Sequence, residues 1–327
     1  MQQIRNEIIY KIVSSIPGNM KPVEYIMQVL HISKGSAYRR LKGTLPFTYD
    51  EIAVLAREMN FSVDEVIHSQ SRRKYIFDFG DYFNEDTSTA ILNSLGEYYN
   101  LLLSEQEMKM RYMIITINNL WFVYTFHFDN LFRFFYYKFL QQSDISHLKN
   151  KMKEIDIPQT IFEIKSKLAD LMRKMDNTYR TSILDRHVFL NTIYEIQYYY
   201  RRKLIDDNEL DNIAKDMEHL LNAVEKEIIE NRYNSDKNQY FLAERNIYTN
   251  SVSIKTDTQL YAHIYQNNLY PIMCYDQQLC QLHRKYLESH KKQSRLISSS
   301  SEELQIDFFE KQYGYVQNLR ENKSLMI

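Results

Sequence analysis

An ordered series of helix start and stop signals within the first seventy residues constrains this chain more than any other feature. Ser33 is a favoured helix N-cap, and Gly43 stands where a left-handed residue usually ends a helix, so they bracket a predicted helix over residues 34–42. Apolar spacing predicts another helix over residues 22–29, with Leu30-His31-Ile32 as the turn between the two. A helix, a turn and a second helix within about 20 residues is the spacing that places the second helix in the major groove of DNA.

Further signals extend this pair into a predicted five-helix domain over residues 1–70. Thr48 and Ser62 are N-cap residues for two later helices, and a helix over residues 3–16 ends before the helix-breaking Pro17-Gly18-Asn19. The residues that we expect to face the core of this domain are Val23, Ile26, Met27, Leu30, Ala37, Leu41, Ile52, Leu55, Ala56 and Met59.

The predicted second helix of the pair carries a cationic face. Ala37 and Leu41 are four residues apart and share the core side, while Arg39 points nearly opposite them at about 100° per residue. Arg39 suits bidentate hydrogen bonds with guanine or phosphate, the lysines beside it suit phosphate, and Gly35 would let the backbone approach DNA closely. The residues predicted to contact DNA are Ser33, Lys34, Gly35, Ser36, Tyr38, Arg39, Arg40 and Lys42. The alternative is an ordinary solvated helix face.

The segments ISKGSAYRRLKG and TLPFTYDEIAVLAREMNFSVDEVI resemble the core of the lambda repressor/Cro-like (XRE) helix-turn-helix family. The match includes Ala37, Leu41, Gly43 and the later Ile-x-x-Leu-Ala…Asn-Phe-Ser-x-Asp-Glu run, and it covers about 65 residues. The chain departs from the family at Met27, where a small residue is usual, and at His31, where glycine is usual; histidine tolerates positive φ, so the turn remains possible. The resemblance implies sequence-specific binding of duplex DNA, often as a dimer.

The charge of the chain is unevenly distributed. Residues 1–74 hold eleven Lys and Arg against seven Asp and Glu, so they carry a net charge of +4, whereas the rest of the chain carries −5. A basic end on an acidic body is typical of a DNA-binding module attached to a separate effector body. The polar segment 69–74 is predicted to be a linker, and its Arg72-Arg73-Lys74 run is equally consistent with an arm that contacts phosphates.

Few helix breakers occur in the chain, since only six glycines and five prolines are present in 327 residues, and this favours long helices. Apolar stripes predict helices from Pro158 to Met175, from Ile183 to Leu204 and from Leu210 to Ile228. The aromatic stretch over residues 86–140 fits helix and strand equally well. We therefore predict a mostly helical body over residues 75–232.

The pattern changes after residue 239. Apolar and polar residues alternate over 252–254 and 260–264, and Asn267-Asn268 precedes another apolar run, which predicts a β-hairpin. Asp276 is a suitable N-cap for a helix to about His290. The prediction is a small α+β unit over residues 233–327, and the fold class is mainly α.

Two groups of residues contain side chains that could bind a metal or transfer a proton. Cys274 and Cys280, with His263 and His283, could form a metal site, but their spacing favours a buried pair of thiols. His187, in the run Asp185-Arg186-His187, could serve acid–base chemistry, but its apolar helical stripe favours a core histidine. We therefore predict no metal and no cofactor.

Several functional classes lack their motifs. The sequence contains no G-x-G-x-x-G, P-loop, H-E-x-x-H or G-x-S-x-G pattern, so we predict that the protein is not an enzyme. The aromatic residues over 98–140 and 194–200 are predicted to be core, with a ligand pocket or a dimer interface as alternatives. The apolar run over 112–128 is interrupted by Asn118 and Asn119 and is shorter than a spanning helix needs, which predicts buried core.

The expected function is that of a transcriptional regulator. Two cysteines and the absence of a signal peptide at the start favour the cytoplasm. The expected partners are duplex DNA, a second copy of the chain, and an unknown small-molecule or protein effector, with no membrane. The alternative is a protein–protein interaction scaffold whose helix-turn-helix-like domain does not bind DNA.

Overall fold

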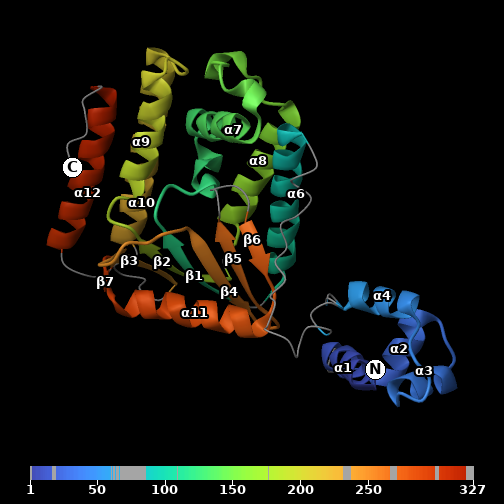
Figure 1. The fold of residues 1–327 in the computed structure, drawn as a ribbon. Coiled ribbons are helices and arrows are strands. Elements are labelled where there is room, and N and C mark those ends of the chain that lie inside the picture. The colour runs from blue at the N-terminus through green and yellow to red at the C-terminus, as the bar shows by residue number, and fades with distance from the viewer. Residues whose placement is uncertain are drawn as a thin grey trace. The chain divides into compact units, whose positions relative to one another are not determined.

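The computed structural model describes residues 2–16, 20–59, 61, 63, 66, 86–108, 110–175, 177–230, 237–265, 271–298 and 302–321. The chain divides into two compact units, residues 1–76 and residues 77–327 (Figure 1). We call them the N-terminal unit and the body.

The N-terminal unit is a small helical domain. Its described helices are α1 (Gln2–Ser15), α2 (Pro22–Leu30), α3 (Lys34–Leu41) and α4 (Tyr49–Glu58). Each contributes a fully buried apolar side chain to one core, namely Ile12, Ile26, Ala37 and Leu55. The first three helices confirm their predicted ranges to within one residue at each end, and α4 begins directly after the predicted cap Thr48. The helix predicted after Ser62, the Pro17–Asn19 break and the 69–74 linker lie wholly or largely outside the described residues.

The body is built around one seven-stranded mixed sheet. Its strands are β1 (Arg111–Ile117), β2 (Thr178–Leu184), β3 (Asn238–Ala243), β4 (Ser251–Thr256), β5 (Leu260–Tyr265), β6 (Pro271–Cys274) and β7 (Ser294–Leu296). The order across the sheet is β6-β5-β4-β1-β2-β3-β7. Strands β1, β2 and β3 lie side by side and are parallel, and the strands outside them pair antiparallel.

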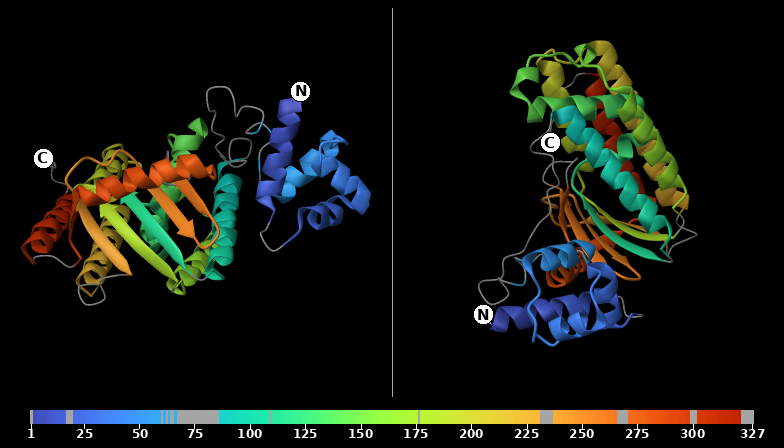
Figure 2. Two further views of the ribbon diagram at one scale, coloured as in Figure 1. Left: turned by 90° about the horizontal axis from the view of Figure 1, so that it is seen from below. Right: turned by 90° about the vertical axis from the view of Figure 1, so that its right-hand side faces the viewer.

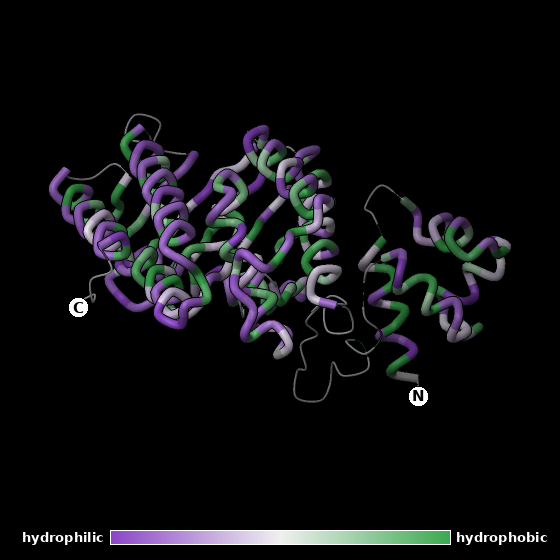
Figure 3. The backbone as a smooth tube through the Cα atoms, turned by 90° about the horizontal axis from the view of Figure 1, so that it is seen from above, coloured by the Kyte–Doolittle hydropathy of each residue, from purple (hydrophilic) through white to green (hydrophobic). Residues whose placement is uncertain are grey.

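Helices cover both faces of this sheet (Figures 1 and 2). One face is covered by α6 (Thr87–Gln106), α7 (Asp129–Ser143), α8 (Gln159–Arg173), α9 (Val188–Arg201) and α10 (Asp207–Glu230), together with the short 3-10 helix η1 (Phe122–His127). Two further short turns, η2 (Ile145–His147) and η3 (Met152–Glu154), follow α7, and α12 (Glu302–Arg320) packs on α9 and α10. The opposite face is crossed by α11 (Gln277–Lys292). Figure 3 shows hydrophobic and hydrophilic residues alternating along these helices, as expected of helices that bury one side.

The side chains of β1 alternate between the two faces of the sheet. Met113, Ile115 and Ile117 belong to the large core beneath α6–α10, whereas Ile114 joins a smaller core with Leu287 of α11. Because both faces are covered, almost every residue of β1 is buried. The apolar run over 112–128 is thus core, as predicted. No helix in the described part of the chain is both long and apolar enough to cross a membrane.

The sequence predicted a boundary between a helical body ending at residue 232 and an α+β unit beginning at residue 233, but one sheet contains strands from both segments. Strands β1 and β2 come from the segment predicted to be a helical body, and they form one sheet with β3–β7. The helix predicted from Ile183 to Leu204 begins later, at Val188, because Ile183 lies in β2. The undecided stretch 86–140 contains both types, since helix α6 is followed by strand β1 and helix α7. The helices predicted over 158–175 and 210–228 are present as α8 and α10.

The last third of the chain contains the predicted local elements. Strands β4, β5 and β6 pair antiparallel in series, and Asn267-Asn268 lies outside the described residues. The Asp276 side chain accepts a hydrogen bond from the backbone N–H of Leu279 and caps α11.

The two cysteines are buried as predicted, but His187 is not. Cys274 and Cys280 are buried free thiols, as predicted, and the Cys280 Sγ lies 3.1 Å from the Cys274 carbonyl oxygen that accepts its hydrogen bond. Among the described residues, no three His, Cys, Asp or Glu side chains group so that they could hold a metal ion. The core position predicted for His187 is wrong: His187 is the exposed N-cap residue of α9, and its ring lies 3.5 Å from the Tyr315 hydroxyl.

Candidate nucleic-acid interface

A left-handed residue turns the chain between α2 and α3. His31 ends α2 with φ 52° and ψ 41°, in the left-handed region that glycine prefers. Histidine adopts this conformation more readily than a branched residue does. The turn therefore forms with the His31 that departs from the family pattern, as the sequence predicted.

Both ends of α3 are closed by the predicted residues. The Ser33 side chain accepts a hydrogen bond from the backbone N–H of Ser36 at 3.3 Å, which satisfies one of the free amides of the first turn. Gly43 follows the helix with φ +73°, and its N–H donates to the Arg40 carbonyl. The helix is short because these two signals stand only ten positions apart.

The core side and the exposed side of α3 are as the helical wheel predicts. Ala37 is fully buried, whereas Lys34, Gly35 and Arg39 are exposed. None of the side chains of Lys34, Arg39 and Lys42 forms an ion pair with a described residue. Three cations without an ion-pair partner in the described part of the chain therefore lie on or directly after one short helix.

Tyr38 and Lys42 form a contact at the flank of this face. The Tyr38 side chain is 49% exposed, and the Lys42 Nζ lies 4.8 Å from the centre of its ring. This distance is within the range of a cation–π interaction, which holds the lysine beside the helix. The flank thus presents an aromatic ring and a cation side by side.

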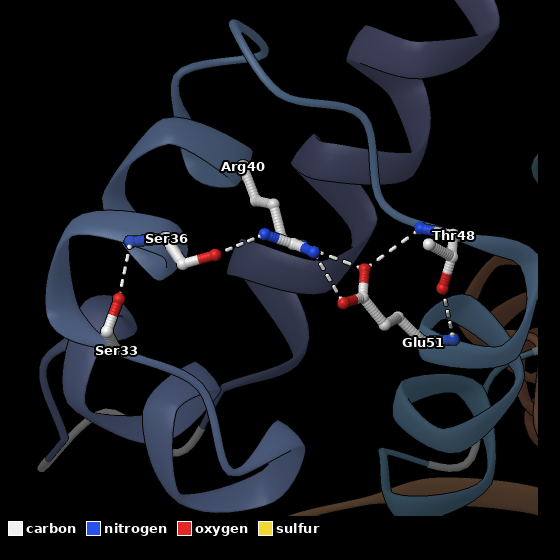
Figure 4. Close-up of polar contacts among 5 residues, drawn as sticks. All are labelled: Ser33, Ser36, Arg40, Thr48 and Glu51. Atoms are coloured by element: carbon white, nitrogen blue, oxygen red, sulfur yellow. Dashed lines mark hydrogen bonds and ion pairs between the residues drawn. The ribbon is translucent and has the colours of Figure 1, made fainter.

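Arg40 differs from the other predicted contact residues because it points back into the unit (Figure 4). Its guanidinium donates two hydrogen bonds to the Glu51 carboxylate, at 2.8 Å from Nε and 2.6 Å from Nη2, and a third to the Ser36 hydroxyl. The Arg40 and Glu51 side chains are only 11% and 17% exposed. Arg40 therefore joins α3 to α4 and is not part of the exposed cationic face.

Glu51 supports this link from the start of α4. Its carboxylate also accepts a hydrogen bond from the Thr48 backbone N–H at 2.9 Å, while the Thr48 hydroxyl accepts one from the Glu51 N–H. Hydrogen bonding to Arg40 holds the pKa of the Glu51 carboxyl below its ordinary value. The sequence contains a signal for this role, since a threonine three residues before a glutamate is the capping-box pattern.

The structure thus separates the eight predicted contact residues into two groups. Exposed positions on or beside α3 are occupied by Ser33, Lys34, Gly35, Tyr38, Arg39 and Lys42. Ser36 and Arg40 are half-buried and bond to each other, so their side chains serve the fold of the unit.

Comparison with known proteins finds a match only within the N-terminal part of the chain. Residues 17–74 match the family model of the BetR domain, a helix-turn-helix-type domain. This family is distinct from the lambda repressor/Cro family that the sequence resembles. No curated protein and no solved structure matches the chain.

Proposed function

We propose that this protein is a non-enzymatic transcriptional regulator that binds specific duplex DNA by placing α3 in the major groove. The observation that carries the proposal is the exposed face of α3, where Lys34 and Arg39 have no ion-pair partner among the described residues. The match of residues 17–74 to a helix-turn-helix-type domain supports the same function. In such domains the second helix of the pair contacts the edges of the bases.

The exposed side chains have distinct roles in this proposal. Arg39, at the centre of the face, donates two hydrogen bonds to the O6 and N7 atoms of a guanine. Lys34 and Lys42, at the two ends, contact phosphates and set the position of the helix in the groove.

In this proposal, Gly35 lets the backbone of α3 approach the DNA closely. A Cβ atom added at Gly35 would have no neighbour within 4 Å, so packing inside the unit gives no reason for a glycine there. Glycine at an exposed helix position costs about 1 kcal/mol relative to alanine. In the proposal this cost is offset when the backbone near Gly35 contacts the DNA backbone.

We further propose that the protein acts in the cytoplasm as a homodimer. The body provides the dimer contacts and the response to an effector. Two copies of α3 related by a two-fold axis would contact half-sites about one helical turn apart. The bound site is therefore expected to be palindromic.

A fluorescence titration of genomic DNA fragments with the full-length protein tests the proposal. The variants are Arg39→Ala and, as a matched control, Arg57→Ala, which makes the same change at an exposed position of α4 outside the predicted contact residues. Loss of a bidentate contact is expected to weaken specific binding by about 10-fold to 100-fold in Arg39→Ala. Arg57→Ala is expected to bind as the wild type does.

The salt dependence of the same titration tests the phosphate contacts. Each of Lys34→Gln and Lys42→Gln is expected to make the negative slope of log K against log salt shallower by about 0.9. Equal binding by the wild type and Arg39→Ala would contradict the role of α3. Absence of binding to any fragment, even at low salt, would instead favour a protein–protein interaction module.

A further inference from the structure

A cavity of about 300 Å³ lies in the body, against the sheet face that carries α6–α10. It lies at the amino ends of the parallel strands, where Arg111 begins β1, Thr178 begins β2 and Asn238 begins β3. Helices α6, α8 and α10 and the segment after β1 supply its other walls. A volume of about 300 Å³ is at the lower end of the range for small-molecule sites, about 300–1,000 Å³.

The lining of this cavity has an excess of positive charge. Three cationic side chains, those of Arg111, Arg180 and Lys237, line it together with one carboxylate, that of Glu227. Arg180 donates to Glu227 and, at 2.6 Å, to the Tyr240 hydroxyl, so this arginine is held in place before any ligand arrives.

The charge of Arg111 is only partly compensated. Its Nη2 lies 2.6 Å from the Glu105 carboxylate, and the two side chains are 5% and 1% exposed. Burial raises the pKa of Glu105 to about 7, although Arg111 opposes this rise. The buried carboxylate thus holds its negative charge less readily than an exposed one would, and it compensates the Arg111 charge only in part.

Several polar atoms of the lining residues lack hydrogen-bond partners within the described part of the chain. The Arg111 Nε, the Trp121 Nε1 and the Arg180 Nε are buried donors of this kind, and the Thr178 hydroxyl is unpaired as well. Arg111 and Trp121 are themselves 4% and 5% exposed. Buried N–H groups in folded proteins are almost always paired, so unpaired donors around one cavity indicate a site that takes an acceptor-rich group.

The remaining wall is apolar and aromatic. Tyr98, Trp121 and Tyr124 contribute rings, and the other apolar lining residues are Leu102, Met113, Ile115, Val123, Met172 and Met175. Methionine side chains adapt to irregular shapes and contact aromatic rings favourably. The cavity thus combines a cationic end with an apolar, aromatic wall.

We propose that this cavity binds a small organic anion, a carboxylate, sulfonate or phosphate joined to an aromatic or aliphatic group. The anionic group lies at Arg111 and Arg180, and the apolar group packs against Trp121 and the methionines. The site lies within the body and does not involve α3. The test of anion binding can therefore succeed or fail independently of the test of DNA binding.

A pair of matched dyes tests the proposal on the full-length protein. The anionic probe is 8-anilinonaphthalene-1-sulfonate, and its neutral counterpart without the sulfonate is N-phenyl-1-naphthylamine. Trp121 is the only tryptophan of the chain, so energy transfer from it reports a probe bound in or near this cavity. We expect saturable binding of one sulfonate probe per chain, at least about tenfold tighter than the neutral dye, since a charged contact contributes about 1.5–3 kcal/mol.

Three substitutions locate the bound probe. Arg180→Gln is expected to weaken the sulfonate probe about tenfold and to leave the neutral dye unchanged. Lys237→Gln, at an exposed residue of the lining, is expected to weaken it about twofold to fivefold and keeps the test available if Arg180→Gln does not fold. Lys255→Gln, which removes the same charge at an exposed position of β4 outside the lining, is the control and is expected to have no effect.

The outcomes separate the proposal from its alternatives. Val123→Phe narrows the cavity and is expected to exclude both dyes while circular dichroism shows an unchanged fold. Equal affinity for the two dyes, or sulfonate binding that Arg180→Gln and Lys237→Gln leave unchanged, would overturn the assignment of an anion site. Binding that persists in Val123→Phe would place the probe elsewhere and would overturn it as well.

Discussion

The ion pair between Arg40 and Glu51 predicts that Arg40 stabilises the N-terminal unit, whereas the exposed Arg39 does not. Arg40→Met removes the charge and the three hydrogen bonds of Arg40 and keeps an unbranched chain of similar width. Glu51 is then left with a half-buried carboxylate that has lost its cation. We expect α3 and α4 to come apart more easily in this variant.

The expected size of the effect follows from the geometry. An exposed ion pair contributes up to about 1 kcal/mol, whereas breaking a fully buried pair costs about 3–5 kcal/mol. The Arg40 and Glu51 side chains are 11% and 17% exposed, and two hydrogen bonds at 2.8 and 2.6 Å join them. The cost therefore lies between these limits, at about 2 kcal/mol, which corresponds to an opening equilibrium about 30-fold more favourable.

Native-state hydrogen exchange of the full-length protein, measured by mass spectrometry, reports this opening locally. Peptides that cover α3 and α4 are expected to exchange about 30-fold faster in Arg40→Met than in the wild type. Arg39→Met is the matched control because it makes the same change one residue earlier, at an exposed position. Its exchange is expected to change by no more than about twofold.

Two results would refute this reasoning. Unchanged exchange in Arg40→Met would mean that the link contributes nothing to the unit. Equal acceleration in Arg39→Met would mean that the effect belongs to the loss of any arginine from α3.

Three further predictions concern both units. His31→Gly is expected to slow exchange of α2 and α3 about fivefold, since glycine relieves about 1 kcal/mol of left-handed strain at φ 52°; faster exchange would contradict this. Thr48→Ala removes the capping box of α4, costs about 1 kcal/mol, and is expected to speed exchange in its first turn; unchanged exchange there would count against the cap. Because the pKa of Glu105 is raised to about 7, the folded body keeps a proton that the unfolded chain releases above pH about 4.5. The free energy of unfolding of the body is therefore expected to fall as pH rises from about 4.5 to 7, and Glu105→Gln should flatten this fall in urea titrations followed by Trp121 fluorescence; an equal slope in both proteins would contradict it.

Short-range signals predicted the N-terminal unit well. The Ser33 cap, the positive φ of Gly43 and the left-handed His31 each depend on residues at most a few positions away, so the sequence contains the information directly. The same is true of Asp276, which caps α11 in the body.

The role of Arg40 depends on a longer-range contact. A helical wheel places Arg40 at the edge of the exposed face of α3, but it gives no partner for it. Glu51 lies eleven residues later on another helix, and only the packing of both helices on α2 brings the two together. The pattern of Thr48 and Glu51 was available as a hint, because a capping glutamate is fixed in position and can accept further hydrogen bonds.

The sheet of the body was the largest difference between prediction and structure. Strand β1 is buried on both faces, so its residues do not alternate between polar and apolar and cannot be told from a buried helix by period. Ile183 continues the apolar spacing of α9 and yet lies in β2. Parallel pairing joins residues more than fifty positions apart, and no local signal gives the register of these strands.

The same pairing explains why the sequence offered a ligand pocket only as one alternative and gave no sign of its charge. Arg111 and Arg180 become neighbours because β1 and β2 pair with Arg111 opposite Thr178 and Met113 opposite Arg180. The aromatic residues of the wall, among them Tyr98 and Trp121, lie in the segment for which a pocket was one alternative. The cationic residues had no such signal.

Selection of bound sites from a random DNA library tests the central claim most directly. Wild-type protein and Arg39→Ala, both full-length, are compared with Lys34→Gln. The account predicts that the wild type enriches a palindromic motif, that Arg39→Ala loses the preference for one guanine in each half-site, and that Lys34→Gln enriches the same motif more weakly. An identical motif with Arg39→Ala, or no motif with the wild type, would contradict the claim that α3 reads DNA.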